Sequence, residues 1–229
     1  MRCLSLFAIR SRLREKMSTQ FVETDNGRYS FEKVALYHGR GKIDREISFE
    51  NLCLAKRVLD RHELKFGLIF GTLLGVVREG NFIEWDEDVD IYMMYEDRKR
   101  LFNALWDLRS AGLELVRYEN GLCSLMRRND YIDIYLFKRV GFFRKCGPDS
   151  IKEKYLKFKH TVNFNGVSFF VPDDAETLLC ELYGLDWRTP KRNSPAKAHG
   201  PIRSAVHFLK RNFPILAIPL IYIKKILKL

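Results

Sequence analysis

Carboxylates placed inside apolar strands constrain the fold of this 229-residue chain more than any other feature of its sequence. The acidic run DEDVD at 86–90 leads into the apolar segment VDIYMM at 89–94, and the segment YIDIYLF at 131–137 carries Asp133 in its middle. A charge in an apolar strand is costly unless it is paired or bound to a metal. The two segments are therefore expected to bring their carboxylates into one site.

The spacing of the acidic residues predicts which of them act together. Asp88 and Asp90 are two residues apart at the start of a strand, so both side chains project from one face, and Asp86 shares their parity if the extended chain reaches back to it. Carboxylates this close repel one another unless a cation lies between them. Asp88, Asp90 and Asp133 are therefore predicted to bind one or two Mg²⁺ or Mn²⁺ ions for phosphoryl transfer. A solvated acidic loop is the alternative for DEDVD alone, but it does not explain Asp133.

A second group of residues, upstream of the acidic run, is suited to holding phosphate. A strand that ends at Gly71-Thr72 and enters a helix presents free backbone N–H groups and the positive end of the helix dipole. Gly71 allows close approach of the backbone, and the Thr72 hydroxyl can cap the helix or bind a phosphate oxygen. Arg78 could form a forked contact with a phosphate, although a surface salt bridge is the alternative for a solitary arginine.

The order of apolar patterns predicts an α/β (mixed α+β) domain with a small mixed sheet flanked by helices. Helices are expected at 48–65, with Ser48 as N-cap and His62 on the apolar face, and at 73–79, 96–112 and 174–184. Strands are expected at 66–70, 89–94, 113–119, 122–128 and 131–137, then as a hairpin at 160–165 and 166–172 around Asn165-Gly166.

The formal net charge of +11 is concentrated at the C-terminal end. Ten of the 40 Lys and Arg residues lie between Arg188 and the C-terminus, where there is no Asp or Glu, so positions 1–187 are nearly neutral. A protein that follows a phosphate backbone usually carries its charge on the folded domain, so no nucleic acid partner is expected. The uncharged run 212–223 is too short to span a bilayer. Its basic flanks suit a segment lying on an anionic membrane surface, and the alternative is packing on the domain's own core.

The termini and cysteines point to the cytoplasm. The apolar stretch near the N-terminus ends at Arg10 and is too short for the core of a signal peptide. The five cysteines are scattered and contain no C-x-x-C pair, which favours a reducing compartment. The expected location is therefore the cytoplasm, with peripheral attachment to the inner face of the membrane through the C-terminal tail.

The segment GTLLGVVREGNFIEWDEDVDI at 71–91 resembles the signature of the LicD/fukutin family, G-T-L-L-G-x-x-R-x-x-x-x-I-x-W-D-x-D-x-D-I. YIDIYLF is similar to the family's later strand carboxylate, and VPDDAETLLCELYGLDWRTP is similar to its closing Tyr-Gly-x-x-W-x-x-P stretch. The resemblance covers about residues 45–190. It leaves residues 1–44 as an N-terminal extension and 191–229 as a basic linker and apolar tail.

The resemblance implies a nucleotidyltransferase-type fold in which Gly71-Thr72 is the glycine turn, Asp88 and Asp90 bind metal, and Asp133 is the third carboxylate. It implies transfer of a phospho-alcohol, such as phosphocholine or ribitol phosphate, from a CDP-activated donor to a glycan or lipid-linked glycan acceptor. Asp133 or Asp86 would orient or deprotonate the acceptor hydroxyl. Glu87 stands where many members have Asp, and it is expected to face away from the metal pair.

Two further expectations stay open at this point. Tyr183 and Trp187 are candidates for stacking on a sugar or base, with packing at a helix end as the alternative. A template-independent nucleotidyltransferase that moves NMP from an NTP to RNA or protein would share the turn and the carboxylates. Transfer of NMP from an NTP, rather than use of a CDP-alcohol, would distinguish it.

Overall fold

The computed structural model describes residues 19–36 and 41–191. The predicted C-terminal membrane segment and the expectations for the first 18 residues lie outside these ranges. Within the described ranges no helix has the length and apolar character needed to cross a membrane. The four described cysteines, Cys53, Cys123, Cys146 and Cys180, are all free thiols.

A nine-stranded mixed sheet forms the centre of the domain, in the order β10-β11-β3-β4-β7-β6-β5, with β8 and β9 extending from β7. The pairs β4–β7 and β11–β3 are parallel, and the others are antiparallel. The strands of this sheet are β3 (Gly67–Leu68), β4 (Val89–Met94), β5 (Glu114–Glu119), β6 (Leu122–Arg127), β7 (Asp130–Val140), β8 (Phe143–Cys146), β9 (Asp149–Lys152), β10 (His160–Phe164) and β11 (Val167–Val171).

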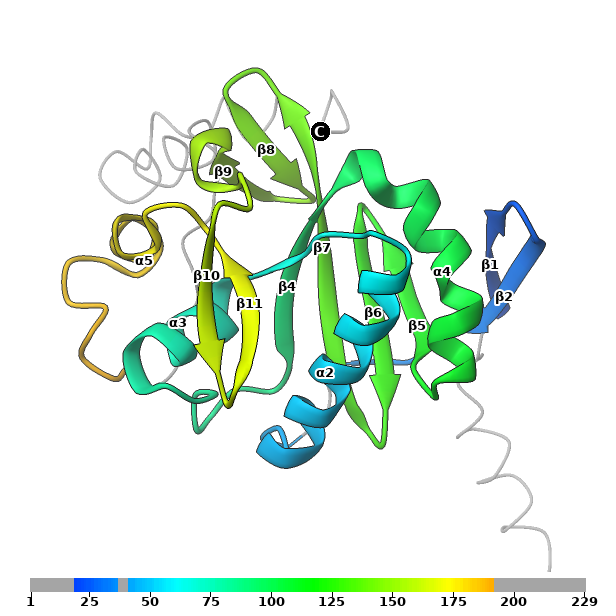
Figure 1. The fold of residues 1–229 in the computed structure, drawn as a ribbon, viewed down its shortest axis with the longest axis horizontal. Helices are drawn as coiled ribbons and strands as arrows, with labels where there is room; N and C mark the ends of the chain where they lie inside the picture. The colour runs from blue at the N-terminus through cyan, green and yellow to red at the C-terminus, as the bar shows by residue number, and fades with distance from the viewer. Residues whose placement is uncertain (1–18, 37–40, 192–229) are drawn as a thin grey trace, which may run out of the picture.

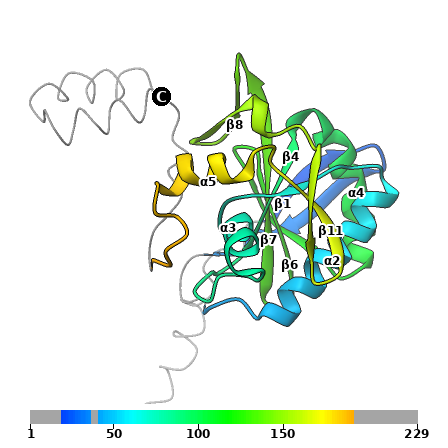
Figure 2. The ribbon, with the colours of Figure 1, turned by 60° about the vertical axis from the view of Figure 1, so that its left-hand side comes forward.

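Helices cover both faces of the sheet. Figure 2 shows α3 (Phe70–Glu79) and α5 (Ala175–Tyr183) on one side, and α2 (Arg45–Arg61) and α4 (Arg98–Ser110) on the other. Two single turns of 3₁₀ helix, Tyr95–Asp97 and Glu153–Tyr155, connect neighbouring elements. The arrangement confirms the predicted mixed α/β fold, with the apolar core between the sheet and its helices.

Helix α2 shows why the predicted helices form, and where the prediction of their ends was wrong. Leu52, Ala55, Val58 and Leu59 recur at helical spacing and are all buried. The N-cap is Asp44, whose carboxylate accepts hydrogen bonds from the backbone N–H groups of residues 46 and 47, and not Ser48 as predicted. The helix ends at Arg61, so the predicted continuation to residue 65 is also wrong.

Two hairpins were not anticipated from the sequence. Strands β1 (Thr19–Thr24) and β2 (Gly27–Glu32) pair within the predicted N-terminal extension, and Val22, Tyr29 and Phe31 join the same core as the sheet. This hairpin lies against α4 (Figure 1), where the ring centroids of Tyr29 and Trp106 are 5.0 Å apart. The other is β8–β9, which projects from the end of β7 (Figure 1).

Candidate active site

A row of polar side chains crosses four neighbouring strands on the face of the sheet that α3 covers. Asp90 of β4 is paired with Asp133 of β7, Asp133 with Ser124 of β6, and Ser124 with Arg117 of β5. Residues that face each other in register project to the same side of a sheet. The parallel pairing of β4 with β7 therefore places two of the predicted carboxylates next to each other.

Asp133, in the middle of this row, is hydrogen-bonded to an arginine and a hydroxyl. Its Oδ2 accepts a hydrogen bond from Arg117 Nη2 at 2.6 Å, and its Oδ1 accepts one from Ser124 Oγ at 2.6 Å. Arg117 Nε also donates to Ser124 Oγ at 2.8 Å. Asp133 is 1% exposed and Arg117 3% exposed. Both carboxylate oxygens of Asp133 are therefore already engaged by charged or polar partners of this chain.

Asp90 lies where the row reaches the first turn of α3. Its Oδ2 accepts a hydrogen bond from the backbone N–H of Gly71 at 3.0 Å, and its own N–H donates to Thr72 Oγ1 at 2.8 Å. Gly71 and Thr72 belong to the helix, which begins at Phe70, whereas the sequence placed them in a turn before it. Phe70 has φ of +46°, a strained value for a non-glycine residue, and this sharp entry directs the Gly71 N–H at Asp90. Thr72 is fully buried, so its hydroxyl connects α3 to β4.

Asp86 and Asp88 complete the cluster. They lie in the segment before β4, which begins at Val89. Burial raises the pKa of both Asp88 and Asp90 well above its usual value. Repulsion from Asp133 and Asp86 raises the pKa of Asp88 further, and repulsion from Asp88, Asp86 and Asp133 raises that of Asp90. A hydrogen bond from the Tyr131 side chain opposes part of this effect on the pKa of Asp88. The buried Oδ2 of Asp86 has no hydrogen-bond partner. The cluster is therefore a site where negative charge is poorly compensated by the protein alone.

Gly71 is predicted to be required because Asp86 lies against it. A Cβ added at Gly71 would meet Asp86 Oδ2 at 2.5 Å, closer than real contacts allow. Gly71→Ala is expected to displace the carboxylate by about 1 Å and to lower turnover roughly 10²-fold, with little loss of stability. Steady-state kinetics and thermal unfolding of the variant test this. Gly41→Ala, at a glycine without a left-handed φ and with no atom within 4 Å of the added Cβ, gives a control for the substitution itself. Equal activity of Gly71→Ala and the wild type would contradict the contact.

The pH dependence of the free energy of unfolding should report the protonation of Asp86. Burial raises the pKa of Asp86 from 3.8 to about 6. A carboxyl whose pKa is higher in the folded state favours folding when protonated, so this contribution is complete below about pH 4 and is lost as the pH rises through about 6. Without divalent metal, Asp86→Asn is therefore expected to gain stability over the wild type between pH 4 and pH 7. Urea unfolding across this range measures the difference, and parallel curves for the two proteins would exclude the effect.

Three other predicted residues lie at the edge of the cluster. Arg78 Nε donates to Glu79 Oε1 at 2.9 Å and its Nη1 donates to the carbonyl of Trp187 at 3.3 Å, so the salt bridge that was the alternative for Arg78 is present. Burial raises the pKa of Tyr183, and the charges of Asp90 and Asp86 raise it further. Trp187 is buried in the core, as the packing alternative expects.

Four site residues were missed in the sequence: Arg117, Ser124, Tyr131 and Tyr135. Tyr131 and Tyr135 flank Asp133 on the same face of β7, and a simple count of alternate positions in YIDIYLF would have found them. Burial raises the pKa of Tyr135, and the charges of Asp90 and Asp133 add to the effect. The signal for Arg117 in the sequence is an arginine inside the predicted strand LELVRYE. That Asp133 is its partner could not be predicted, because it depends on the order of β5, β6 and β7.

Two solved structures are similar to this chain at low identity. The antibiotic-resistance factor ANT(2'')-Ia in solution gives a TM-score of 0.47 at 13% identity and covers 81% of this chain and 97% of that one. The lincosamide antibiotic adenylyltransferase LnuA bound to lincomycin gives a TM-score of 0.42 at 12% identity and covers 61% of this chain and 85% of that one.

Sequence comparison gives the family. A stretch of 47 residues is 38% identical to the lipopolysaccharide cholinephosphotransferase LicD of Haemophilus influenzae, over 20% of this chain and 17% of that protein. The chain thus matches less than a fifth of the length of this curated relative. Residues 63–174, which include the whole carboxylate cluster and the first turn of α3, match the family model for the LicD/FKTN/FKRP nucleotidyltransferase domain. Residues 63–174 of this chain are therefore identified as a LicD-family domain.

Proposed function

We propose that this chain is a metal-dependent phosphotransferase that moves a phospho-alcohol from a CDP-activated donor to a hydroxyl of a cell-surface glycan or its lipid-linked precursor. The LicD-family domain supports a transferase. The observation that carries the proposal is the placement of two carboxylates at the first turn of α3: Asp90 accepts the backbone N–H of Gly71, and Asp86 Oδ2 lies against the Gly71 Cα. Burial raises the pKa of Asp86, Asp88 and Asp90. Buried carboxylates that lie close together need a cation between them if all are to be ionised at once.

The residues of the cluster fit a divalent cation. Asp86 Oδ2 is buried without a partner, and carboxylate oxygens are the ligands that Mg²⁺ and Mn²⁺ prefer. Within the described part of the chain, no group of three or more His, Cys, Asp or Glu side chains is arranged so that it could hold a metal ion, so the carboxylates would have to rearrange on binding. Asp88 and Asp90 would hold the ion. When bound, it would neutralise charge on the donor diphosphate.

Asp86 is the better candidate for the base that receives the acceptor's proton. Its pKa of about 6 is close to neutral pH, which suits a general base, and one of its oxygens is free of hydrogen bonds. Asp133, the alternative, has both oxygens bonded to Arg117 and Ser124. The acceptor oxygen would attack the phosphorus that carries the alcohol, and the bond from this phosphorus to the bridging oxygen would break, releasing CMP.

The residues around the cluster would bind and orient the donor. The N-terminal turn of α3 contributes its positive dipole end beside Asp90. Arg78 would contact a phosphate only after leaving Glu79. Tyr183 would contact the sugar or base of the donor, as predicted from the sequence. Thr72 would act by positioning Asp90, because its hydroxyl is fully buried and already accepts the Asp90 N–H.

The C-terminal tail is proposed to hold the enzyme at the cytoplasmic membrane surface, where a lipid-linked acceptor would be available. The support is its sequence, with basic residues on both sides of the uncharged run 212–223. Deletion of residues 204–229 is expected to move the protein into the soluble fraction and to leave metal binding intact. Retention of the truncated protein on membranes would rule out the anchor.

Turnover with isotope-labelled donors tests the proposed reaction. Purified protein with Mg²⁺ would be given CDP-choline, CDP-ribitol, CDP-glycerol, CDP-ethanolamine and the four NTPs, each with and without a membrane glycolipid extract. CDP-choline leads the panel because the Haemophilus influenzae relative is named a cholinephosphotransferase. CMP release from one CDP-alcohol, increased by the extract, is the expected result. Pyrophosphate release from an NTP would instead identify a nucleotidyltransferase.

A further inference from the structure

A hollow of about 320 Å³ lies beside the β7–β8 hairpin, on the side of the sheet away from the carboxylate cluster. Its lining includes Leu136 and Lys138 of β7, which alternate with Tyr135 and Phe137 and therefore point to the opposite face from Asp133. Tyr95 and Tyr118 form aromatic walls. The hollow is thus a separate site, with no residue in common with the cluster.

Two lysines face each other across the hairpin at this hollow. Lys138 and Lys145 are register partners in the antiparallel pair β7–β8, and both line the hollow. Like charges placed directly opposite each other destabilise a strand pair. Neither lysine forms an ion pair with any carboxylate in the described ranges. The ammonium of Lys138 lies 5.6 Å from the ring centroid of Tyr95, its only charge-related contact among the described residues.

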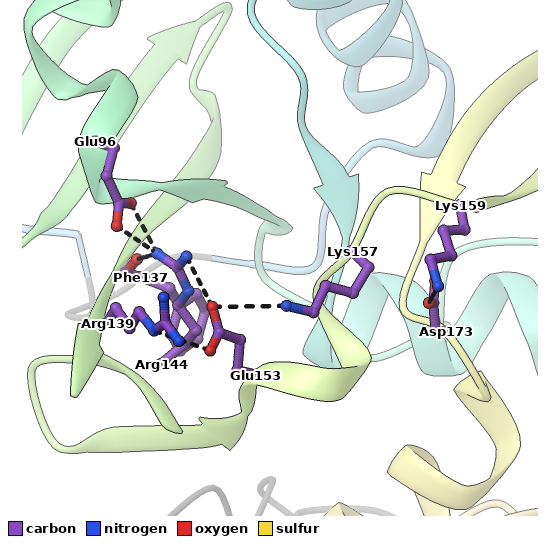
Figure 3. Close-up of polar contacts among 8 residues, drawn as sticks. All are labelled: Glu96, Phe137, Arg139, Arg144, Glu153, Lys157, Lys159 and Asp173. Carbon is purple, nitrogen blue, oxygen red and sulfur yellow. Dashed lines mark hydrogen bonds and ion pairs between the residues drawn. The ribbon is translucent and has the colours of Figure 1, made fainter. Parts of the chain in front are cut away.

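The neighbouring register pair across β7 and β8 also consists of two cations, but acidic side chains neutralise it. Arg139 and Arg144 also face each other across β7 and β8, but on the other face of the hairpin. Figure 3 shows Glu153 beside both arginines. Its carboxylate lies 3.1 Å from Arg139 Nε and 3.1 Å from Arg144 Nη2, and Glu96 lies 2.7 Å from Arg144 Nη1. This cationic pair therefore has counter-charges, and the pair at the hollow has no ion-pair partner among the residues that the structure describes.

A third cation lies behind the aromatic walls. Arg98 Nη1 donates to the hydroxyl of Tyr95 at 2.5 Å, and Arg98 also bonds to the Tyr118 side chain. The acidic residues nearest in sequence to Arg98 and Tyr118 are used elsewhere, as Glu96 pairs with Arg144, Asp97 with Arg100, and Glu119 with Lys33. Asp149 is the register partner of Cys146, next to Lys145, but forms no ion pair with Lys145. The hollow therefore gathers two exposed lysines that have no ion-pair partner in the described part of the chain.

We propose that this hollow binds a phosphomonoester group. Its charge near neutral pH, about −1.5 to −2, matches the two ammonium groups of Lys138 and Lys145. The tyrosine walls would contact the organic part of the ligand. Soluble sugar phosphates and lipid phosphates share this chemistry, and the vesicle experiment below distinguishes them. Binding would remove the repulsion across the hairpin, so the ligand should stabilise the protein as well as bind to it.

Thermal unfolding at constant ionic strength tests the proposal with glucose 6-phosphate as the probe and sodium chloride as the reference. The wild type is expected to show a saturable rise in Tm with the probe. Lys138→Gln/Lys145→Gln should unfold at a higher temperature than the wild type without probe, because the repulsion is removed, and should lose at least tenfold in apparent affinity. Lys157→Gln/Lys159→Gln also removes two lysines, which pair with Glu153 and Asp173 (Figure 3), and should retain binding.

Vesicles distinguish the two sources of the phosphate group. Selective flotation with phosphatidic acid vesicles over phosphatidylcholine vesicles, lost in Lys138→Gln/Lys145→Gln but not in the control, would identify a lipid phosphate. A response to glucose 6-phosphate alone would identify a soluble ester. The proposal is overturned if neither probe exceeds the chloride reference, or if the two double variants respond equally. Because the hollow and the carboxylates lie on opposite faces, this outcome is independent of the turnover test.

Discussion

The double substitution Asp88→Asn/Asp90→Asn is expected to reduce phosphotransfer by at least ~10³-fold while leaving the metal-free protein as stable as the wild type or more stable. The loss of activity follows because the two carboxylates would hold the cation that neutralises the donor diphosphate. The retained stability follows because burial raises the pKa of both carboxyls and each repels its neighbours, so neutral amides remove an unfavourable interaction. Asn at position 90 can still accept the Gly71 N–H.

Three measurements on the same preparation separate this expectation from simple misfolding. Turnover should fall, Tm in EDTA should stay equal or rise, and the rise in Tm that Mg²⁺ or Mn²⁺ gives the wild type should disappear. Glu87→Gln is the matched control, because Glu87 is exposed and directly precedes Asp88 in the chain. Retained activity in the double variant, or equal loss in Glu87→Gln, would remove Asp88 and Asp90 from the proposed metal site.

Arg117→Met is expected to destabilise the fold by about 3–5 kcal/mol, because it leaves Asp133 buried without its charged partner. For a chain of this size, such a loss corresponds to a fall in Tm of roughly 10 °C or more. Arg117→Lys should recover only part of it, since an ammonium cannot reach both Ser124 and Asp133 with the fixed geometry of a guanidinium. Urea unfolding of the purified variants measures these differences.

The double variant Arg117→Met/Asp133→Asn tests whether the cost comes from the uncompensated charge. Replacing both members of a buried ion pair is often close to neutral, so most of the stability should return. Arg128→Met gives the surface reference, because the Arg128–Glu50 pair is exposed and such pairs contribute about 0–1 kcal/mol. Equal effects of Arg117→Met and Arg128→Met would show that the buried pair has no special role in stability.

These two predictions assign different roles to carboxylates that the sequence could not tell apart. Asp88, Asp90 and Asp133 appear in the sequence as three equivalent acidic residues at the start or middle of apolar strands. In the structure, Asp133 is bonded to Arg117 and Ser124, whereas Asp86 has an oxygen with no partner. Asp133 therefore belongs to the framework of the site, and Asp86 and Asp88 are the less compensated members.

The sequence by itself determined the local features of this protein. Strand β4 was predicted at its observed bounds, Val89–Met94. A shared face for Asp88 and Asp90 stays a prediction, because Asp88 precedes the strand. The helices α2, α4 and α5 were predicted from helical spacing of apolar residues, with errors mainly at their ends. Such features depend on neighbours within a few positions, which the sequence shows directly. The motif at 71–91 likewise identified the family without any knowledge of the fold.

Only the tertiary structure decided which distant residues meet. The parallel pairing of β4 with β7 placed Asp90 beside Asp133, and the antiparallel order of β5, β6 and β7 added Ser124 and Arg117 to the same row. The pairing of β7 with β8 brought Lys138 opposite Lys145. Strand order and register are set by packing between segments far apart in the chain, and local periodicity contains no information about them. The carboxylates of the site could thus be identified from the sequence, but the distant residues that lie beside them could not.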